Sequence, residues 1–78
     1  MLTRMAETIG ARMKLGRQKL SMSQEEAALE ADVSIRQWAA IERDEVDDPH
    51  LSTLMSVASV LGITLEALIR GESLKIGS

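Results

Sequence analysis

The 78 residues make one domain, near the lower size at which a single hydrophobic core supports independent folding, and the 45% apolar share supplies such a core. One Trp and no Phe or Tyr leave the core to aliphatic helix formers, while the absence of Cys and the single His exclude disulfides, thiolate metal sites and a His-rich metal cluster. The net charge of −3 opposes binding of nucleic acid, so the distribution of the charge along the chain matters more than its sum.

The first predicted element is a helix from about Thr3 to about Leu20. Within residues 1–24, five side chains are basic and one is acidic, a balance of +4, so this is the basic part of the chain. Apolar residues recur here at every third or fourth position, as expected for one face of an amphipathic helix. That stripe consists of Leu2, Met5, Ile9, Met13, Gly16 and Leu20.

Two short helices are predicted next. Ser23 is a suitable N-cap, and Glu26 three residues later completes a capping box, which starts a helix over Gln24–Ala31. Asp32 tolerates a positive φ and fits the tight connection that follows, and Ser34 caps a third helix. Two short capped helices joined by such a turn are typical of a helix-turn-helix.

The third helix is predicted to end near Arg43, with Trp38 and Ile41 on its inner face. Residues 44–48 then read as an exposed loop, and four of these five residues are acidic. Without those four carboxylates the chain would carry +1, so the acidity of the sequence is a local feature.

Two further helices complete the predicted order. The fourth begins after Pro49 and stops at Gly62, and Thr64 caps a short fifth helix, through about Arg70, that ends at Gly71. The buried face of the fourth helix is expected to hold Leu51, Leu54, Ala58 and Leu61.

The predicted fold is therefore all-α, a compact five-helix bundle with a central helix-turn-helix. We expect residues 1–71 to form this domain and residues 72–78 to form a C-terminal tail. No apolar run reaches the ~18 residues of a membrane span, and the N-terminus lacks the apolar stretch of a signal peptide, so we expect a cytoplasmic protein without a membrane partner. No metal-ligand spacing, Gly-rich phosphate loop or nucleophile–base pair is visible, so we expect neither an enzyme nor a cofactor, metal or small-molecule ligand.

A specific set of short stretches extends over nearly the whole chain. They are Ile9-Gly10-Ala11-Arg12-Met13, Arg17, Ser23-Gln24-Glu25-Glu26, Ala28, Val33-Ser34, Ile41-Glu42-Arg43, Pro49, Leu54, Ala58 and Leu61-Gly62-Ile63-Thr64. In this order the sequence resembles the lambda-repressor-like family, also called the Cro or XRE helix-turn-helix family, over roughly residues 9–70. The resemblance implies a five-helix fold whose third helix enters the major groove of double-stranded DNA. It thus implies a sequence-specific transcriptional regulator, a repressor or controller, at the nucleoid.

The resemblance also implies roles for single residues. Gln24 at the start of the second helix and Arg43 after the third hold positions of phosphate contacts, and the dipole of the second helix favours an anion at its N-terminus. Arg17 and Glu42 hold the positions of a structural ion pair that ties the first helix to the third. For the two phosphate positions, the alternative is an ordinary solvated side chain.

Four residues hold the positions that face base edges in the family: Ser34, Ile35, Arg36 and Ala40. Arg36 fits a bidentate contact to guanine, whereas Ile35 and Ala40 fit contacts to thymine methyl groups. The alternatives are an ordinary exposed arginine at position 36 and a contact of Ile35 with a protein instead of DNA.

Three core positions depart from the family pattern. Ala27 stands where Leu is usual, Gly16 where an apolar residue is usual, and Trp38 where a smaller aliphatic residue is usual. Because close-packed cores do not tolerate uncompensated changes in volume, we expect the indole to fill the vacated space. Trp38 is therefore predicted to pack against Ala27 and near Gly16.

The acidic loop is the departure that concerns function. Family members usually have Gly and a basic or polar loop after Glu-Arg, whereas carboxylates close to DNA phosphates are repulsive. Three explanations compete: the loop swings away from the duplex, dimerisation supplies compensating contacts, or the domain has exchanged DNA for a protein partner. The last explanation gives the alternative function, a protein-interaction module that keeps the fold but has lost DNA binding.

Apolar residues beyond the core face of the fourth helix favour a homodimer, since a domain this small cannot bury all of them. The predicted interface consists of Val57, Val60, Leu65, Ile69 and Leu74. The family commonly pairs through this region, which places two recognition helices about one DNA turn apart. The alternative is that Leu65, Leu68 and Ile69 only close the core.

Overall fold

Five helices follow one another along residues 7–71, the part of the chain that the computed structural model describes. They are α1 (Ile9–Lys19), α2 (Gln24–Ala31), α3 (Ile35–Glu42), α4 (Leu51–Leu61) and α5 (Leu65–Arg70). No strand occurs within these residues, so the predicted all-α fold of five helices is confirmed. Three predicted features lie outside the described residues: Leu2 and Met5 of the first apolar stripe, and the tail 72–78 with Leu74. The predicted helix start near Thr3 is wrong, because Thr8 is extended and serves as the N-cap of a helix that begins at Ile9.

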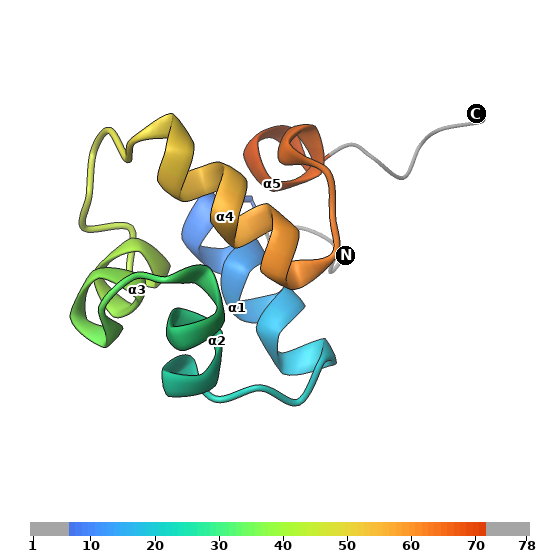
Figure 1. The fold of residues 1–78 in the computed structure, drawn as a ribbon. Coiled ribbons are helices and arrows are strands. Elements are labelled where there is room, and N and C mark those ends of the chain that lie inside the picture. Colours follow the sequence, from blue (N-terminus) through green and yellow to red (C-terminus); the bar gives the residue numbers. More distant parts are fainter. Residues whose placement is uncertain (1–6, 72–78) are drawn as a thin grey trace.

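The helices pack around α1 and α4, which contact each other at the centre of the fold. Figure 1 shows α4 (yellow to orange) in front of α1, with the pair α2–α3 on one side and α5 on the other. Within residues 7–71, no helix combines the length and the hydropathy that a membrane span requires. The core consists of Met13, Ala27, Ala28, Ala31, Trp38, Ile41, Leu54, Val57, Ala58, Leu61 and Leu68.

Four of these helices begin at a hydroxyl N-cap, which satisfies one of the free backbone N–H groups of the first turn. The caps are Thr8, Ser23, Ser34 and Thr64. The predicted capping box is present, since the Glu26 N–H donates to Ser23 Oγ at 3.0 Å and the Ser23 N–H donates to Glu26 Oε1 at 2.8 Å. The helix starts of the helix-turn-helix are therefore encoded locally.

The first four helices also share one type of C-terminal end. Each ends in a left-handed residue, which is the C-cap itself in α2 and α4 and the residue after the C-cap in α1 and α3. In chain order these residues are Ser21 (φ 57°), Asp32 (φ 60°), Asp44 (φ 57°) and Gly62 (φ 70°). The N–H of the next residue then donates to a carbonyl five residues earlier, at 3.0 Å each: Met22 to Arg17, Val33 to Ala28, Glu45 to Ala40 and Ile63 to Ala58. This is the Schellman motif, and it fixes the direction in which the chain leaves each helix.

Two predicted core residues are instead exposed. Leu20 lies beyond the end of α1, where the chain leaves the helix, so it no longer follows the stripe of Met13. Leu51 is 58% exposed because it is the first residue of α4, next to the exposed His50. Leu54, three residues later, is buried as predicted.

Trp38 is fully buried in the same core cluster as Ala27. The prediction that the indole fills the space beside Gly16 is wrong. A Cβ atom at Gly16 would have three atoms of Leu61 as its nearest neighbours, at 3.3 to 3.7 Å. Leu61 of α4 therefore borders Gly16, because α1 packs there against α4.

Polar contacts tie α1 to its neighbours at both ends of the molecule. The Asp44 carboxylate accepts hydrogen bonds from Thr8 Oγ1 at 2.8 Å and from the Gly10 N–H at 3.0 Å, so it caps the N-terminus of α1. Arg12 Nε donates to the Leu68 carbonyl at 2.6 Å, at the C-terminal end of α5. These contacts hold α1 between the end of α3 and the end of α5.

Replacing Gly10 with Ala is expected to lower the free energy of unfolding by about 1–3 kcal/mol, because the new methyl group overpacks a backbone contact. A Cβ atom there would lie 2.6 Å from the Ile41 carbonyl oxygen and closer still to that of Glu42. Gly16→Ala is the matched control in the same helix: the nearest atom to its methyl group is a terminal methyl carbon of Leu61 at 3.3 Å, which can shift, and the gain in helix propensity offsets the crowding. Equal urea midpoints for the two variants would contradict this packing.

Candidate nucleic-acid interface

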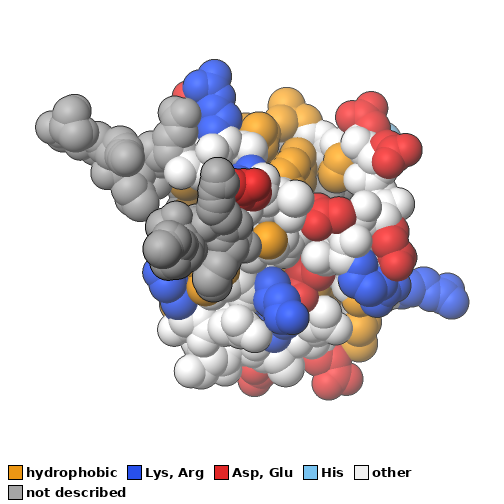
Figure 2. All heavy atoms as spheres, turned by 180° about the vertical axis from the view of Figure 1, so that it is seen from behind, with side chains coloured by type: hydrophobic (Ala, Val, Ile, Leu, Met, Phe, Trp, Pro, Cys, Tyr) orange, Lys and Arg blue, Asp and Glu red, His pale blue; other side chains and the backbone are white. Residues whose placement is uncertain are grey.

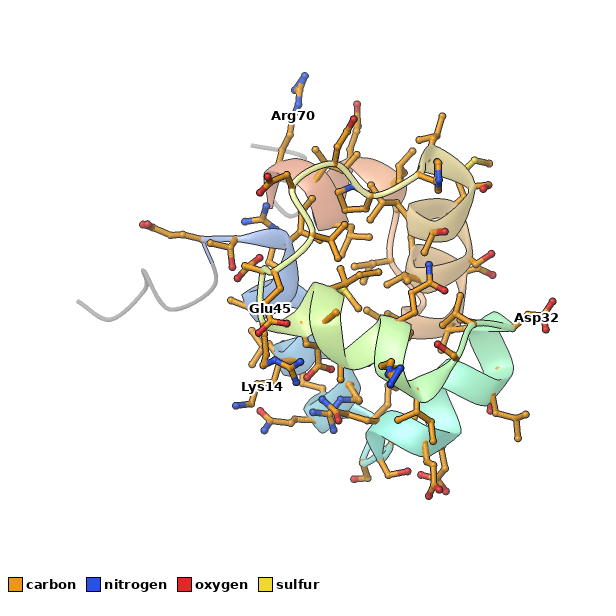
Figure 3. All side chains as sticks on the ribbon, turned by 90° about the vertical axis from the view of Figure 1, so that its left-hand side faces the viewer. Lys14, Asp32, Glu45 and Arg70 are labelled. Carbon is orange, nitrogen blue, oxygen red and sulfur yellow. The ribbon has the colours of Figure 1, made fainter. Side chains whose placement is uncertain are left out.

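The outer face of α3 is the candidate surface for reading DNA. Ser34, Ile35 and Arg36 are exposed, and Ala40 is half-buried, whereas Trp38 on the opposite side is in the core. Figure 3 looks onto this helix, with Glu45 at its carboxyl end and Asp32 beyond its amino end. Arg36 and Ala40, four residues apart, thus share the outer side of α3, while Ser34 and Ile35 are exposed at its amino end.

Gln37 is also exposed on α3, although it is not among the base-reading residues predicted from the sequence. Its N–H donates to Ser34 Oγ at 2.9 Å, which closes the N-terminal turn of α3. The Gln37 side chain carries an amide, the group that pairs bidentately with adenine in the major groove. The feature of the sequence that indicates Gln37 as a base-reading residue is its position next to Arg36 in the first turn of the predicted helix.

A carboxylate anchors α3 from behind. Glu42 Oε2 lies 2.6 Å from Arg17 Nε of α1 and accepts a 2.7 Å hydrogen bond from Trp38 Nε1. Its Oε1 accepts 3.0 Å hydrogen bonds from Arg17 Nη2 and from Gln24 Nε2 of α2. The ion pair implied by the family resemblance is therefore part of a larger network that joins α1, α2 and α3.

These contacts determine the ionisation of Glu42. Burial alone would raise the pKa of this carboxyl group. The hydrogen bonds from Arg17, Trp38 and Gln24, with the charge of the guanidinium, outweigh burial and hold the pKa of the carboxyl group below its usual value. The Arg17–Glu42 pair is therefore ionised at neutral pH, and the base of α3 is rigidly held.

Gln24 occupies the first turn of α2 and is half-buried. The hydrogen bond to Glu42 fixes the orientation of its amide nitrogen, which carries a second hydrogen for a further acceptor. Arg43, at the C-cap of α3, is exposed instead. Its guanidinium already donates to the carboxylate of Glu45, through Nε at 2.8 Å and Nη2 at 3.0 Å.

The acidic segment 44–48 is not one uniform loop. Asp44 caps α1, and Glu45 is held by its backbone bond to α3 and by its pair with Arg43, so these two residues do not swing away from the rest of the fold. Asp47 and Asp48 are exposed. The four carboxylates that look alike in the sequence therefore fall into three different environments.

The predicted dimer residues differ in exposure. Val57 is fully buried, so its assignment to a dimer interface is wrong: α4 is covered on that side by its neighbours in the same chain. Val60 and Leu65 are partly buried against the core, and Ile69 is 40% exposed. Leu68 is fully buried and closes the core.

Charges of both signs occupy the surface. On the face in Figure 2, Lys and Arg side chains alternate with Asp and Glu side chains and form no continuous basic patch. Within residues 7–71, no group of three His, Cys, Asp or Glu side chains is arranged to hold a metal ion. What the described residues present is a helix-turn-helix unit with its second helix anchored from behind and accessible in front.

The helix-turn-helix family model matches residues 13–68, and the chain belongs to this family. The resemblance to the lambda-repressor-like proteins is thereby confirmed. An immunity repressor protein of Bacillus phage phi105 is 40% identical over 67 residues, which are 86% of this chain and 46% of that protein. The chain thus spans about half the length of this relative.

Solved structures of the same fold include two repressor-like regulators. The P22 c2 repressor in complex with a synthetic operator superposes with a TM-score of 0.79 at 24% identity, over 85% of this chain and 98% of that chain. The biofilm regulator SinR in complex with DNA superposes with a TM-score of 0.74 at 31% identity, over 78% of this chain and 97% of that chain. The N-terminal DNA-binding domain of SinR from Bacillus subtilis gives a TM-score of 0.74 at 32% identity, over 77% and 87%.

Proposed function

We propose that this domain is a sequence-specific DNA-binding transcriptional repressor that inserts α3 into the major groove. The observation that carries the proposal is the two-sided character of α3: Trp38 and Glu42 fix it from behind, while Arg36 and its neighbours stand free in front. The phage immunity repressor among its relatives and the SinR complex with DNA support this function. A repressor of this kind acts at the nucleoid, in the cytoplasm.

The proposed contacts are of two kinds: contacts to bases, which read the DNA sequence, and contacts to phosphates, which position α3 in the groove. Arg36 reads guanine, and Ile35 and Ala40 contact thymine methyl groups, with Ser34 at the edge of the same surface. Gln24 and Arg43 contact phosphates on either side of α3 and set its register in the groove. The ion pair behind α3 keeps these two sets of contacts in a fixed relation.

We further propose that the repressor binds as a homodimer. Ile69 is the exposed apolar residue of α5, and Val60 and Leu65 lie partly exposed beside the core, so this end of the molecule offers an apolar surface to a second copy. Leu74 belongs to the same proposed interface. A two-fold pair of α3 helices about 34 Å apart would then match a palindromic operator.

Replacing Arg36 with Ala is expected to relax selectivity at one base position by about 1–3 kcal/mol and to leave the unfolding transition unchanged, because the side chain is exposed. Arg70→Ala is the control with the same change of charge, since Arg70 projects from the far end of the molecule in Figure 3. Binding should be measured on mixed genomic fragments, first across salt concentrations and then by selection of bound sequences. A flat salt dependence for the unchanged protein would reject the DNA-binding proposal.

The alternative function is a protein-interaction module that has lost DNA binding. One observation favours it: Leu29 is 80% exposed in an open groove between α2 and the start of α3, which Glu25, Glu26 and Val33 also line. An apolar groove with carboxylates at its rim suits a basic, apolar segment of another protein. The double variant Asp47→Lys, Asp48→Lys separates the two functions. Under the protein-interaction alternative it still does not bind duplex DNA, whereas under the repressor proposal it binds duplex DNA more tightly than the unchanged protein.

A further inference from the structure

Arg43 and Glu45 form a pair joined by two hydrogen bonds at the carboxyl end of α3. The guanidinium donates through Nε and Nη2 to the two carboxylate oxygens, at 2.8 and 3.0 Å. Both side chains are more than half exposed, at 59% and 53%, so the pair lies on the surface. It occupies the place at which the proposed function puts a DNA phosphate.

The backbone fixes this arrangement. Glu45 donates its N–H to the Ala40 carbonyl at 3.0 Å in the Schellman motif that ends α3. Asp44, between the two partners, is left-handed and bound to Thr8 and to the Gly10 N–H of α1. The Glu45 carboxylate is therefore held within reach of Arg43 by the fold and not by a flexible loop.

We propose that Glu45 is an internal competitor for phosphate at Arg43, and that it weakens the binding of this domain to duplex DNA of any sequence. The inference rests on the proposed DNA-binding function. Carboxylate and phosphate are alternative acceptors for the same edge of a guanidinium. An incoming phosphate must displace Glu45 or share Arg43 with a neighbouring negative charge, and each course weakens the contact.

The carboxylate is charged whenever DNA is present at physiological pH. The hydrogen bonds from Arg43, with its charge, hold the pKa of the Glu45 carboxyl group below its usual range. Glu45 is therefore ionised, and able to compete with phosphate, at physiological pH. Because phosphate contacts carry no base information, the penalty applies equally to all sequences and leaves specificity to the face of α3.

Glu45 also changes the salt dependence of DNA binding. In an ordinary contact, an arginine releases a condensed cation from the DNA, which contributes about one unit to the slope of log K against log salt. While Arg43 remains paired with Glu45, it neutralises no phosphate, so this position releases no condensed cation from the DNA. Removing the charge of Glu45 should therefore make the slope steeper by about one.

The test uses Glu45→Gln, which keeps the size of the side chain and removes its charge. Asp47→Asn is the matched control, because it removes the same charge from an exposed residue of the same segment. Both are made in the unchanged protein and in an Arg43→Gln background. The dissociation constant of a labelled mixed-sequence duplex is measured by fluorescence anisotropy over a series of salt concentrations.

We expect Glu45→Gln to tighten binding about two- to fivefold more than Asp47→Asn does, with the steeper slope, and to lose this advantage in the Arg43→Gln background. The proposal that Glu45 competes with phosphate would be overturned by equal effects of the two substitutions on binding. It would also be overturned if Glu45→Gln still tightened binding more than Asp47→Asn in the Arg43→Gln background. In both of those cases the unchanged protein still binds DNA with a steep salt dependence. If neither the unchanged protein nor any variant binds a duplex, the proposed DNA-binding function is rejected, and the proposed competition by Glu45 is rejected with it.

Discussion

Replacing Trp38 with Ala is expected to lower the free energy of unfolding by about 3–5 kcal/mol. Trp38 is the largest of the fully buried side chains, and its removal leaves a cavity in a core that otherwise holds only Met, Leu, Ile, Val and Ala. It also removes the Nε1 donor to Glu42. For a domain of 78 residues, whose total stability is of the order of 4–12 kcal/mol, this loss brings the protein close to unfolding at physiological temperature.

Circular dichroism during urea and thermal unfolding measures the effect without relying on the indole. Trp38→Phe separates its two causes, because the smaller ring keeps most of the volume and loses only the hydrogen bond, so a cost of about 1–2 kcal/mol is expected. Leu29→Ala is the control for a large apolar side chain at an exposed position. A Trp38→Ala variant that melts with the unchanged protein would show that the core does not depend on the indole.

Local chemistry explains why so much of the fold was predictable. Ser23 and Glu26 form the predicted capping box, Asp32 has the predicted positive φ, and Gly62 ends α4 as expected. Each of these signals acts between residues fewer than five positions apart, so the sequence carries it directly. A hydroxyl cap at the start and a left-handed residue at the end bound four of the five helices, α1, α2, α3 and α5, where the left-handed residue after α5 is Gly71.

Predictions that depend on how helices approach one another were less accurate. The period of α4 identifies its buried stripe but not the width of the stripe, so Val57 was placed on a free surface although α2 and α5 both pack on α4. Likewise, the small size of Gly16 showed that something must fill the space, but not that Leu61 fills it. Both answers depend on contacts between residues that are far apart in the sequence.

The acidic segment shows the same limit for the candidate site. In the sequence its carboxylates form one negative cluster, and the cluster predicts repulsion of DNA. In the structure Asp44 caps a helix that begins 35 residues earlier, and Glu45 binds the arginine proposed to contact phosphate. A count of charges cannot separate these roles, because each depends on the partner that the fold brings near.

Replacing Glu42 with Gln is expected to lower the free energy of unfolding by about 3 kcal/mol at neutral pH. The change leaves the partly buried guanidinium of Arg17 without a charged partner, and breaking one side of a buried pair costs more than the pair itself contributes. Gln keeps one oxygen acceptor for Trp38, so the packing around the indole is retained. Glu30→Gln, at an exposed position on α2, controls for the loss of one negative charge.

The pH dependence of the free energy of unfolding shows whether the charge of Glu42 causes this loss of stability. The pKa of the Glu42 carboxyl group is lower in the folded domain than the value of about 4.3 expected for the unfolded chain, so the network stabilises the fold above that value. As the pH falls from about 5 through the lower folded pKa, the carboxylate is protonated and this stabilisation is lost. The stability difference between the unchanged protein and Glu42→Gln should therefore shrink steadily across this interval, whereas Glu30→Gln should track the unchanged protein. A difference that stays constant from pH 7 to pH 3 would mean that shape, and not the charge of Glu42, holds α3 against α1 and α2.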